Sequence, residues 1–286
     1  MVTQTWTTLG VLDWTAKRFA DQGISSARLE AQLLLAYALQ CSRTQLYMNF
    51  DQPLGETELA SYRELIKRRL AGEPVAYIMH EHEFWGMPLV IESSVLVPRP
   101  DTETVIEVAR VFRADRSAPC RVLDLCTGSG AIALALAKEL PAATVIATEL
   151  SPAAAAVARA NVEKNHFVGR IEVREGDLWA PVAGERFDLI VSNPPYIPSA
   201  VIATLSAEVR HEPLMALDGG ADGLAFYDRI CVAARDHLVP GGALVVEHGY
   251  DQADTVRARF ERAGFRDVTL VNDLGKNPRV TTGIAP

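Results

Sequence analysis

Three things are scarce in this sequence of 286 residues, and the first is paired cysteine. Its four cysteines form no C-x-x-C pair, so they predict neither a disulfide framework nor a zinc site; they are Cys41, Cys120, Cys126 and Cys231. Long apolar runs are missing too, because residues 131–137 are followed by Lys138 and no basic-then-apolar signal starts the chain. We therefore expect a cytoplasmic protein that does not bind membranes.

Positive charge is the third scarcity. The chain has 28 Lys and Arg against 36 Asp and Glu, a net charge of −8, which argues against direct nucleic-acid binding. Positions 1–75 carry eight basic and eight acidic residues, so the negative surplus belongs to the remainder. Hydrophobic residues make up 49% of the chain, enough for the cores of one large and one small domain.

The first 75 residues read as helical. Ser25 and Ser26 precede apolar residues at helical spacing and are expected to cap a first helix. Ser42 and Gln45 resemble a capping box for a short second helix, and a third is expected over roughly 56–71. We predict a helical N-terminal domain over 1–75.

A basic trio, Lys67, Arg68 and Arg69, lies on the polar face of the third expected helix. Such a run is most often a solvated face, and a partner-docking role is the alternative.

Residues 76–97 change to short strands and turns. Strands are expected at 84–91 and 95–97, with Gly86 and Pro88 indicating a hairpin that links two domains. The run His80-Glu81-His82 lacks a third ligand at a suitable spacing, so we expect a solvated loop and no metal site.

Residues 98–286 alternate strand and helix. Strands are expected at 121–126, 143–149, 170–175, 187–191, 242–248, 265–271 and 278–283, and helices at 130–139, 152–164, 200–209, 223–237 and 252–263. This alternation predicts a mostly parallel sheet with helices on both faces, which binds its ligands at the carboxyl ends of the strands.

A glycine-rich turn follows the first of these strands. Gly128, Gly130 and Ala133 satisfy the dinucleotide pattern, and Glu149 lies 19 residues beyond Gly130, where it would hold ribose hydroxyls. Asp124 would repel a pyrophosphate but suits an ammonium group, so we expect S-adenosylmethionine instead. The alternative is that Asp124 only hydrogen-bonds its own turn.

Asp177 follows the third strand on the same edge of the sheet. Its carboxylate could accept a hydrogen bond from an adenine amino group while Leu178 or Trp179 packs on the ring. A capping or turn role is the competing interpretation.

The stretch Asn193-Pro194-Pro195-Tyr196 ends a buried strand. Asn193 offers an acceptor and a donor, the prolines fix the direction of the backbone carbonyls, and Tyr196 supplies a flat face. Such a site can hold a planar NH2 group, although a proline-rich strand exit is the simpler alternative.

With these motifs assembled, the chain resembles the protein-(glutamine-N5) methyltransferases of peptide-chain release factors over nearly its whole length. The similar segments are 72–78, 83–86, 95–100, 124–130, 193–196, 212–213, 216–217 and 219–220. Asn-Pro-Pro-Tyr alone indicates only methylation of a planar nitrogen, and the segments between 72 and 103 are the specific ones. Two departures stand out: Cys126 replaces the usual glycine, and Glu149 stands where Asp is common.

The resemblance implies a Rossmann-like class I methyltransferase domain with seven strands, the last of them antiparallel, and an N-terminal domain that docks the substrate. It also implies methylation of the glutamine in the Gly-Gly-Gln motif of release factors 1 and 2. The expected cofactor residues are Asp124, Thr127, Gly128, Gly130, Glu149, Asp177, Trp179 and Asn193. The expected catalytic residues are Asn193, Pro194 and Tyr196. The expected substrate residues are Asn193, Pro194, Pro195 and Tyr196, with Phe84 or Trp85 near the sulfonium.

Three other functions fit parts of the pattern. A nucleic-acid amino methyltransferase shares the tetrapeptide, but the net charge of −8 disfavours it. A ribosomal-protein glutamine methyltransferase shares the chemistry and differs mainly in its N-terminal domain. A non-enzymatic module that binds the cofactor leaves Asn193 without a role.

Overall fold

The computed structural model describes residues 5–113 and 115–286. They form two compact units, one made of residues up to His80 together with Ser206–His211, the other of Glu81–Leu205 and Glu212–Pro286. The boundaries expected from the sequence (1–75, 76–97 and 98–286) stay a prediction, and residues 1–4 lie outside the described part. Among the described residues, no helix has the length and apolar character needed to cross a membrane.

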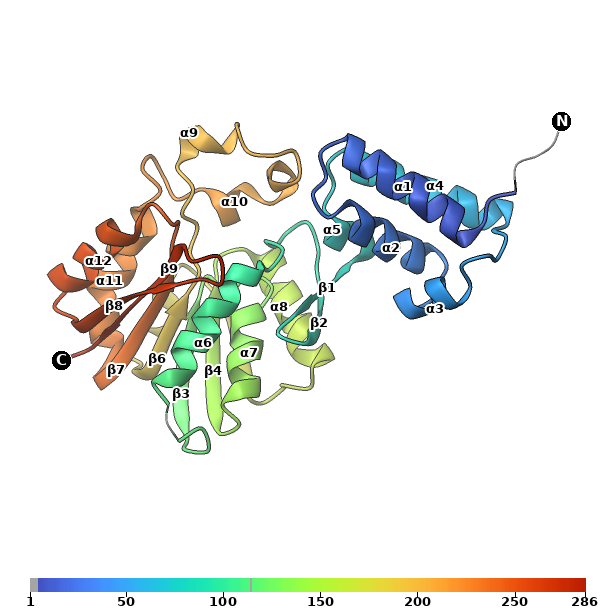
Figure 1. The fold of residues 1–286 in the computed structure, drawn as a ribbon. Coiled ribbons are helices and arrows are strands. Elements are labelled where there is room, and N and C mark those ends of the chain that lie inside the picture. The colour runs from blue at the N-terminus through green and yellow to red at the C-terminus, as the bar shows by residue number, and fades with distance from the viewer. Residues whose placement is uncertain (1–4, 114) are drawn as a thin grey trace. The chain divides into compact units, whose positions relative to one another are not determined.

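The first unit is helical, with α1 (Thr8–Asp21), α2 (Ala27–Ala38), α3 (Arg43–Met48), α4 (Glu56–Leu70) and α5 (Val75–Met79) (Figure 1). The capping box of Ser42 and Gln45 is present, as predicted. Ser26 is the N-cap residue of α2, as predicted, although its side chain makes no capping hydrogen bond among the described residues. Helix α1 was not expected from the sequence. Its N-cap is Thr7, whose side-chain oxygen accepts a hydrogen bond from the Gly10 N–H at 3.2 Å.

The basic trio is a solvated face only in part, because Lys67 is exposed and Arg68 is half-exposed, whereas Arg69 is buried. The Arg69 side chain is only 5% exposed and lies between Glu30 at 2.6 Å and Glu208 at 2.7 Å. Two carboxylates thus compensate one buried guanidinium, which needs such partners once it leaves water. Lys67 remains exposed.

The second unit begins with a hairpin of β1 (Glu81–Phe84) and β2 (Met87–Val90). Its two turn residues, Trp85 and Gly86, have φ of 53° and 64°, the left-handed pair that a two-residue hairpin turn requires. The expected strand at 95–97 is wrong: the Val97 N–H donates to the Glu212 carboxylate at 3.0 Å instead of to a strand.

Within the described residues, the strands after the hairpin form one seven-stranded sheet in the order β5-β4-β3-β6-β7-β9-β8. They are β3 (Cys120–Leu125), β4 (Ala143–Glu149), β5 (Ile171–Glu175), β6 (Phe187–Ser192), β7 (Leu238–Glu247), β8 (Arg266–Asn272) and β9 (Pro278–Ile284). Strands β3 to β7 are parallel, and β9 runs antiparallel to both β7 and β8. The predicted class I methyltransferase fold is confirmed, including its antiparallel last strand.

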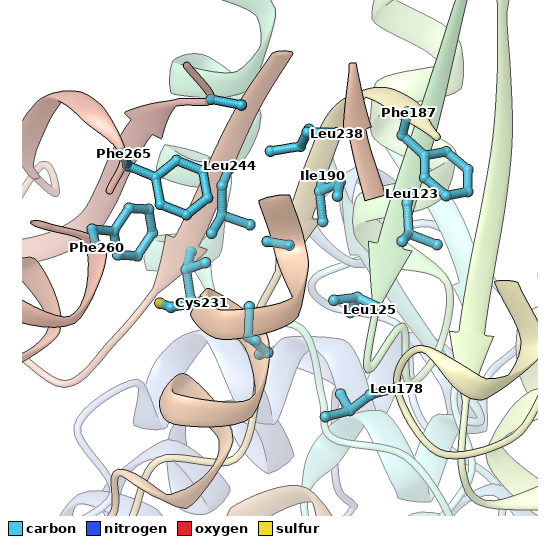
Figure 2. Packing of buried hydrophobic residues seen from close by; sticks show 14 of the residues in the cluster. Leu123, Leu125, Leu178, Phe187, Ile190, Cys231, Leu238, Leu244, Phe260 and Phe265 are labelled. Carbon is cyan, nitrogen blue, oxygen red and sulfur yellow. The ribbon is translucent and has the colours of Figure 1, made fainter. Parts of the chain in front are cut away.

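Helices cover the sheet on both faces (Figure 1). They are η1 (Pro100–Thr102), α6 (Glu103–Val111), α7 (Ala131–Glu139), α8 (Pro152–Lys164), η2 (Ala180–Val182), α11 (Ala225–His237) and α12 (Ala253–Arg262). On one face, Leu123, Leu125, Ile190 and Leu244 pack against Phe260 and Cys231 of α12 and α11 in a fully buried cluster (Figure 2). This packing fixes the carboxyl ends of the strands.

The single helix expected over 200–209 is wrong. The structure has α9 (Ser199–Ile202), η3 (Val209–His211) and α10 (Leu214–Leu217) there. The Ile197 N–H donates to the Leu217 carbonyl and the Ser199 N–H to the Gly220 carbonyl, both at 2.9 Å. The ends of the segment are thereby tied together as a loop, which a continuous helix would prevent.

Candidate active site

A cavity of about 240 Å³ lies at the carboxyl ends of β3, β4, β5 and β6. Residues from the turns after these four strands line it, among them Thr127, Glu149, Asp177 and Asn193. Parallel strands place their carboxyl ends at one edge of the sheet, which is why these separate motifs meet.

The Asp124 carboxylate lies beneath the loop and is completely buried. Its Oδ2 accepts from the Thr127 hydroxyl at 2.6 Å and from the Ala133 N–H at 3.1 Å, so it organises its own turn and the start of α7. Its Oδ1 has no partner among the described residues, although a buried carboxylate oxygen ordinarily has one. Asp124 thus combines the turn role with one free acceptor, and it lies behind the described residues that line the cavity.

Glu149 ties two strand ends together. Its Oε2 accepts from the Gly128 N–H and its Oε1 from the Ser151 N–H, each at 2.9 Å. A carboxylate has about four acceptor sites, so both oxygens can still accept from a ligand in the cavity.

The loop after β3 runs through left-handed backbone. Gly128 and Gly130 have φ of 56° and 83°, and a Cβ on Gly128 would meet nothing within 4 Å. Cys126 also has a positive φ, 59°, which explains why glycine suits this position and why cysteine is strained there. Cys126 lines the cavity, and burial raises the pKa of its thiol.

The turn after β5 brings two of its three predicted residues to the cavity. Asp177 and Leu178 line it, and Asp177 also pairs with Arg229. Trp179 is outside the described lining: its ring stacks on His237 with centroids 4.6 Å apart, and its indole N–H donates to the Arg229 carbonyl. Of the two residues expected to pack on the adenine ring, Leu178 lines the cavity and Trp179 does not.

The turn after β6 brings Asn193 and Pro195 to the cavity. The Asn193 side-chain NH2 donates to the Thr102 hydroxyl at 3.2 Å. Pro194 is buried, and neither it nor Tyr196 belongs to the described lining. The Tyr196 hydroxyl points instead to the Glu247 carboxylate, 3.4 Å away.

The two aromatic residues expected near the sulfonium lie elsewhere. Phe84 is buried, and the Trp85 indole N–H donates to the Glu139 carboxylate at 3.0 Å. Neither belongs to the described lining, whereas Phe226, at the start of α11, does. Sequence reasoning missed Phe226, and its only signal was an aromatic residue in the first turn of a helix that follows a glycine-rich loop.

Two buried carboxyl groups have raised pKa values. Burial raises the pKa of Asp124 to about 7, against the effect of its hydrogen bonds from Thr127 and Ala133. Burial also raises the pKa of Glu247 to about 7, opposed by a hydrogen bond from Thr102, by the charge of Arg279 and by Tyr196. Glu247 was missed, although the expected strand 242–248 places an acid at the ligand-binding edge.

The residues present fit S-adenosylmethionine, because the Glu149 and Asp177 carboxylates that line the cavity are acceptors for its hydroxyl and amino groups. The fold agrees. A methyltransferase from Pyrococcus furiosus has the same architecture, with a TM-score of 0.52 at 22% identity over 78% of this chain and 98% of that one. Fold and site together define a class I methyltransferase with S-adenosylmethionine as methyl donor.

Sequence comparisons narrow the class. Residues 10–79 match the PrmC N-terminal domain model and residues 108–209 the methyltransferase small domain model. The release factor glutamine methyltransferase of Geobacter sulfurreducens is 49% identical over 97% of this chain and 96% of its own length. That of Bordetella pertussis is 43% identical over 92% and 96%. The chain belongs to the release factor glutamine methyltransferase family.

Proposed function

We propose that this enzyme transfers a methyl group to the side-chain amide nitrogen of the glutamine in the Gly-Gly-Gln motif of peptide-chain release factors. The observation that carries the proposal is Asn193, which lines the cavity and has its NH2 held by Thr102. With its nitrogen turned toward Thr102, its Oδ1 is available to a planar amide in the cavity. The relatives named above act on this class of substrate.

The lining of the cavity supports an assignment of residues to the parts of the cofactor. Glu149 would hold the ribose hydroxyls, Asp177 and Leu178 the adenine, and the Thr127–Gly128 loop above Asp124 the methionine end. When bound, S-adenosylmethionine supplies an electrophilic methyl group on sulfur. The left-handed backbone at Gly128 leaves space where a side chain would point toward the ligand.

The substrate nitrogen needs orientation more than it needs a base. A glutamine amide is a poor nucleophile because its lone pair is delocalised into the carbonyl. The Asn193 Oδ1 and the Pro194 carbonyl would accept from its two N–H groups and so hold the nitrogen facing the methyl group. The same acceptors stabilise the positive charge that develops on nitrogen.

A methyl-transfer assay with radiolabelled cofactor tests the proposal. Release factor should be labelled, and a release factor in which the motif glutamine is replaced by alanine should not. Ribosomal protein, transfer RNA and DNA serve as competing substrates. Label in any of these at a rate above that of release factor, or label in the alanine-substituted factor, would overturn the assignment.

The identity of the release factors, their docking and the place of the reaction are further parts of the proposal. We propose that release factors 1 and 2 are both substrates, that the helical domain 1–75 docks them, and that the reaction takes place in the cytoplasm, where release factors meet the ribosome. Lys67 is the most exposed member of the basic trio, because Arg68 pairs with Glu73 and Arg69 is buried.

The test compares Lys67→Glu with the wild type on whole release factor and on a free Gly-Gly-Gln peptide. We expect a higher KM for the whole factor only, and equal effects on both substrates would rule this docking role out.

A further inference from the structure

Gln252 is a buried residue between β7 and α12, and its side chain binds backbone groups of three different turns. Its Oε1 accepts from the Gly249 N–H at 3.0 Å. Its Nε2 donates to the Tyr196 carbonyl at 2.9 Å and to the Gly223 carbonyl at 3.2 Å. The side chain thus joins the turn after β6, the turn before α11 and the turn after β7.

These partners allow only one orientation of the Gln252 amide. A primary amide carries both of its N–H donors on nitrogen and accepts only at oxygen. A flipped amide would place its NH2 against the Gly249 N–H and its oxygen against two carbonyl oxygens. Gln252 is also the N-cap residue of α12, yet its side chain makes no capping bond among the described residues. Joining the three turns therefore accounts for its contacts, and capping does not.

The turn after β6 depends on donors from elsewhere in the chain. Pro194 and Pro195 have no N–H group, so this turn can form few hydrogen bonds of its own. Its last residue, Tyr196, accepts at its carbonyl from Gln252, 56 residues away. Gln252 therefore holds the end of the turn whose Asn193 and Pro195 line the cavity.

The turn before α11 lies directly against the Tyr196 backbone. A Cβ at Gly223 would lie 2.4 Å from the Tyr196 carbonyl oxygen, and the φ of 76° at Gly223 also favours glycine. A Cβ at Gly219 would lie 2.8 Å from the Tyr196 Cα. Phe226, which follows this turn at the start of α11, lines the cavity. Gln252 thus holds together two segments that each supply residues to the cavity.

The two carbonyls that Gln252 binds would repel each other without it. Both oxygens carry partial negative charge and lie within 3.2 Å of the same nitrogen. The NH2 group supplies a hydrogen to each oxygen, and this matters most in a buried place, where an unpaired carbonyl is costly.

We propose that Gln252 is a positioning residue for methyl transfer, which fixes the turn after β6 so that Asn193 meets the substrate glutamine in the productive geometry. This inference rests on the proposed function, because it assigns a task at the same site. Gln252 lies outside the described lining of the cavity and acts through the turn. A displacement of about 1 Å at a reacting group can lower a rate about a hundredfold, so such a residue matters without touching the substrate.

Gln252→Glu is the direct test, because it keeps the shape of the side chain and an acceptor but removes at least one of the two donors. We expect kcat to fall about ten- to a hundredfold, on whole release factor and on a free Gly-Gly-Gln peptide alike. Cofactor affinity by calorimetry should change less than about threefold, because the three groups that Gln252 binds lie outside the turns after β3, β4 and β5. A Gln252→Glu enzyme with wild-type kcat would overturn the proposal.

Gln252→Met is the second variant. It removes all three hydrogen bonds without introducing a charge, and it keeps the test available if the acidic variant does not fold. The same division is expected, with a lower kcat and nearly unchanged cofactor affinity. An equal loss of both would contradict a role confined to the substrate side.

Asn165→Asp is the matched control. The Asn165 NH2 also donates to two backbone carbonyls, those of Pro88 and Asn161, each at 3.1 Å. These three residues lie outside the described lining, so the substitution should leave kcat unchanged. An equal fall in kcat in Asn165→Asp and Gln252→Glu would trace the effect to general destabilisation and overturn the proposal.

Amide hydrogen exchange gives a readout that needs no methyl transfer. The Ile197 N–H donates to the Leu217 carbonyl and the Gly219 N–H to the Ile197 carbonyl, each at 2.9 Å, so these N–H groups report on the two joined segments. In Gln252→Glu they should exchange about tenfold faster, while the N–H groups of β3 and β4 keep their rates. Faster exchange together with wild-type kcat would mean that Gln252 only supports the loops, which also overturns the proposal.

Failure of the function and failure of the positioning can be told apart. If the wild type methylates no release factor but exchange rises in Gln252→Glu, the proposed function fails and the anchoring of the turn stands. If release factor is methylated and neither kcat nor exchange changes in Gln252→Glu, the function stands and the positioning fails.

Discussion

Two buried carboxylates at the same edge of the sheet differ in how they are held. Asp124 takes its hydrogen bonds from Thr127 and Ala133, at most nine residues away in the chain. Glu247 has the Tyr196 hydroxyl 3.4 Å from its Oε1 and is influenced by the charge of Arg279, and both residues come from other parts of the chain. Both have a pKa raised to about 7.

The difference matters for what each acid can do. Asp124 belongs to a local motif, which folds the cofactor loop wherever that motif occurs. Glu247 owes its place to the register of β6 against β7, which puts it beside the turn after β6. The cofactor side of the cavity is therefore locally encoded, and the substrate side is assembled by tertiary contacts.

Asn193 variants should show the largest effect. Asn193→Ala removes an acceptor for the developing charge and should lower kcat about 10²–10³-fold, with cofactor affinity unchanged. Asn193→Asp should be as poor, because its carboxylate cannot donate to Thr102 and lies beside the Glu247 carboxylate. Steady-state kinetics and calorimetry measure both quantities, and near-normal kcat in Asn193→Ala would refute the mechanism.

Glu149 tests the cofactor side. Glu149→Ala should weaken S-adenosylmethionine binding about ten- to a hundredfold, because it removes hydrogen bonds to a charged acceptor and releases the Gly128 and Ser151 N–H groups. Glu149→Asp keeps the charge and is the control. Unchanged affinity by calorimetry would exclude the ribose role, and tight binding of NAD would overturn the choice of cofactor.

Asp124 should make the stability of the folded protein depend on pH. Its folded-state pKa lies above the ordinary value near 4, so the stability it contributes is present at low pH and is lost as pH rises through about 7. Relative to wild type, Asp124→Asn should therefore gain stability between pH 4 and pH 7, by up to about 1.4 kcal/mol per pH unit. Urea unfolding at several pH values measures the difference, and a constant offset would contradict the buried-acid account.

Trp179 should have the smallest effect. Its ring stacks on His237 outside the cavity, so Trp179→Phe should change cofactor affinity less than about twofold. Leu178→Ala is the comparison and should weaken binding, since Leu178 lines the cavity. Equal losses of cofactor affinity in the two variants would indicate that Trp179 also contacts the cofactor.

The sequence alone determined the fold class, the family and the residues of the local motifs. Alternating strands and helices, the turn through Gly128 and the tetrapeptide at Asn193 all depend on neighbours in the chain, and short-range patterns report such features reliably. The same is true of the capping box at Ser42, whose two partners are three residues apart.

Only the tertiary structure decided which side chains face the cavity. Leu178 and Phe226 line it while Trp179, Phe84 and Trp85 do not, and Arg69 is buried by Glu208, 139 residues away. Thr102 meets Asn193, 91 residues away in the chain, because η1 lies against the turn after β6. Side-chain direction and long-range pairing depend on packing between distant segments, and no local pattern in the chain specifies that packing.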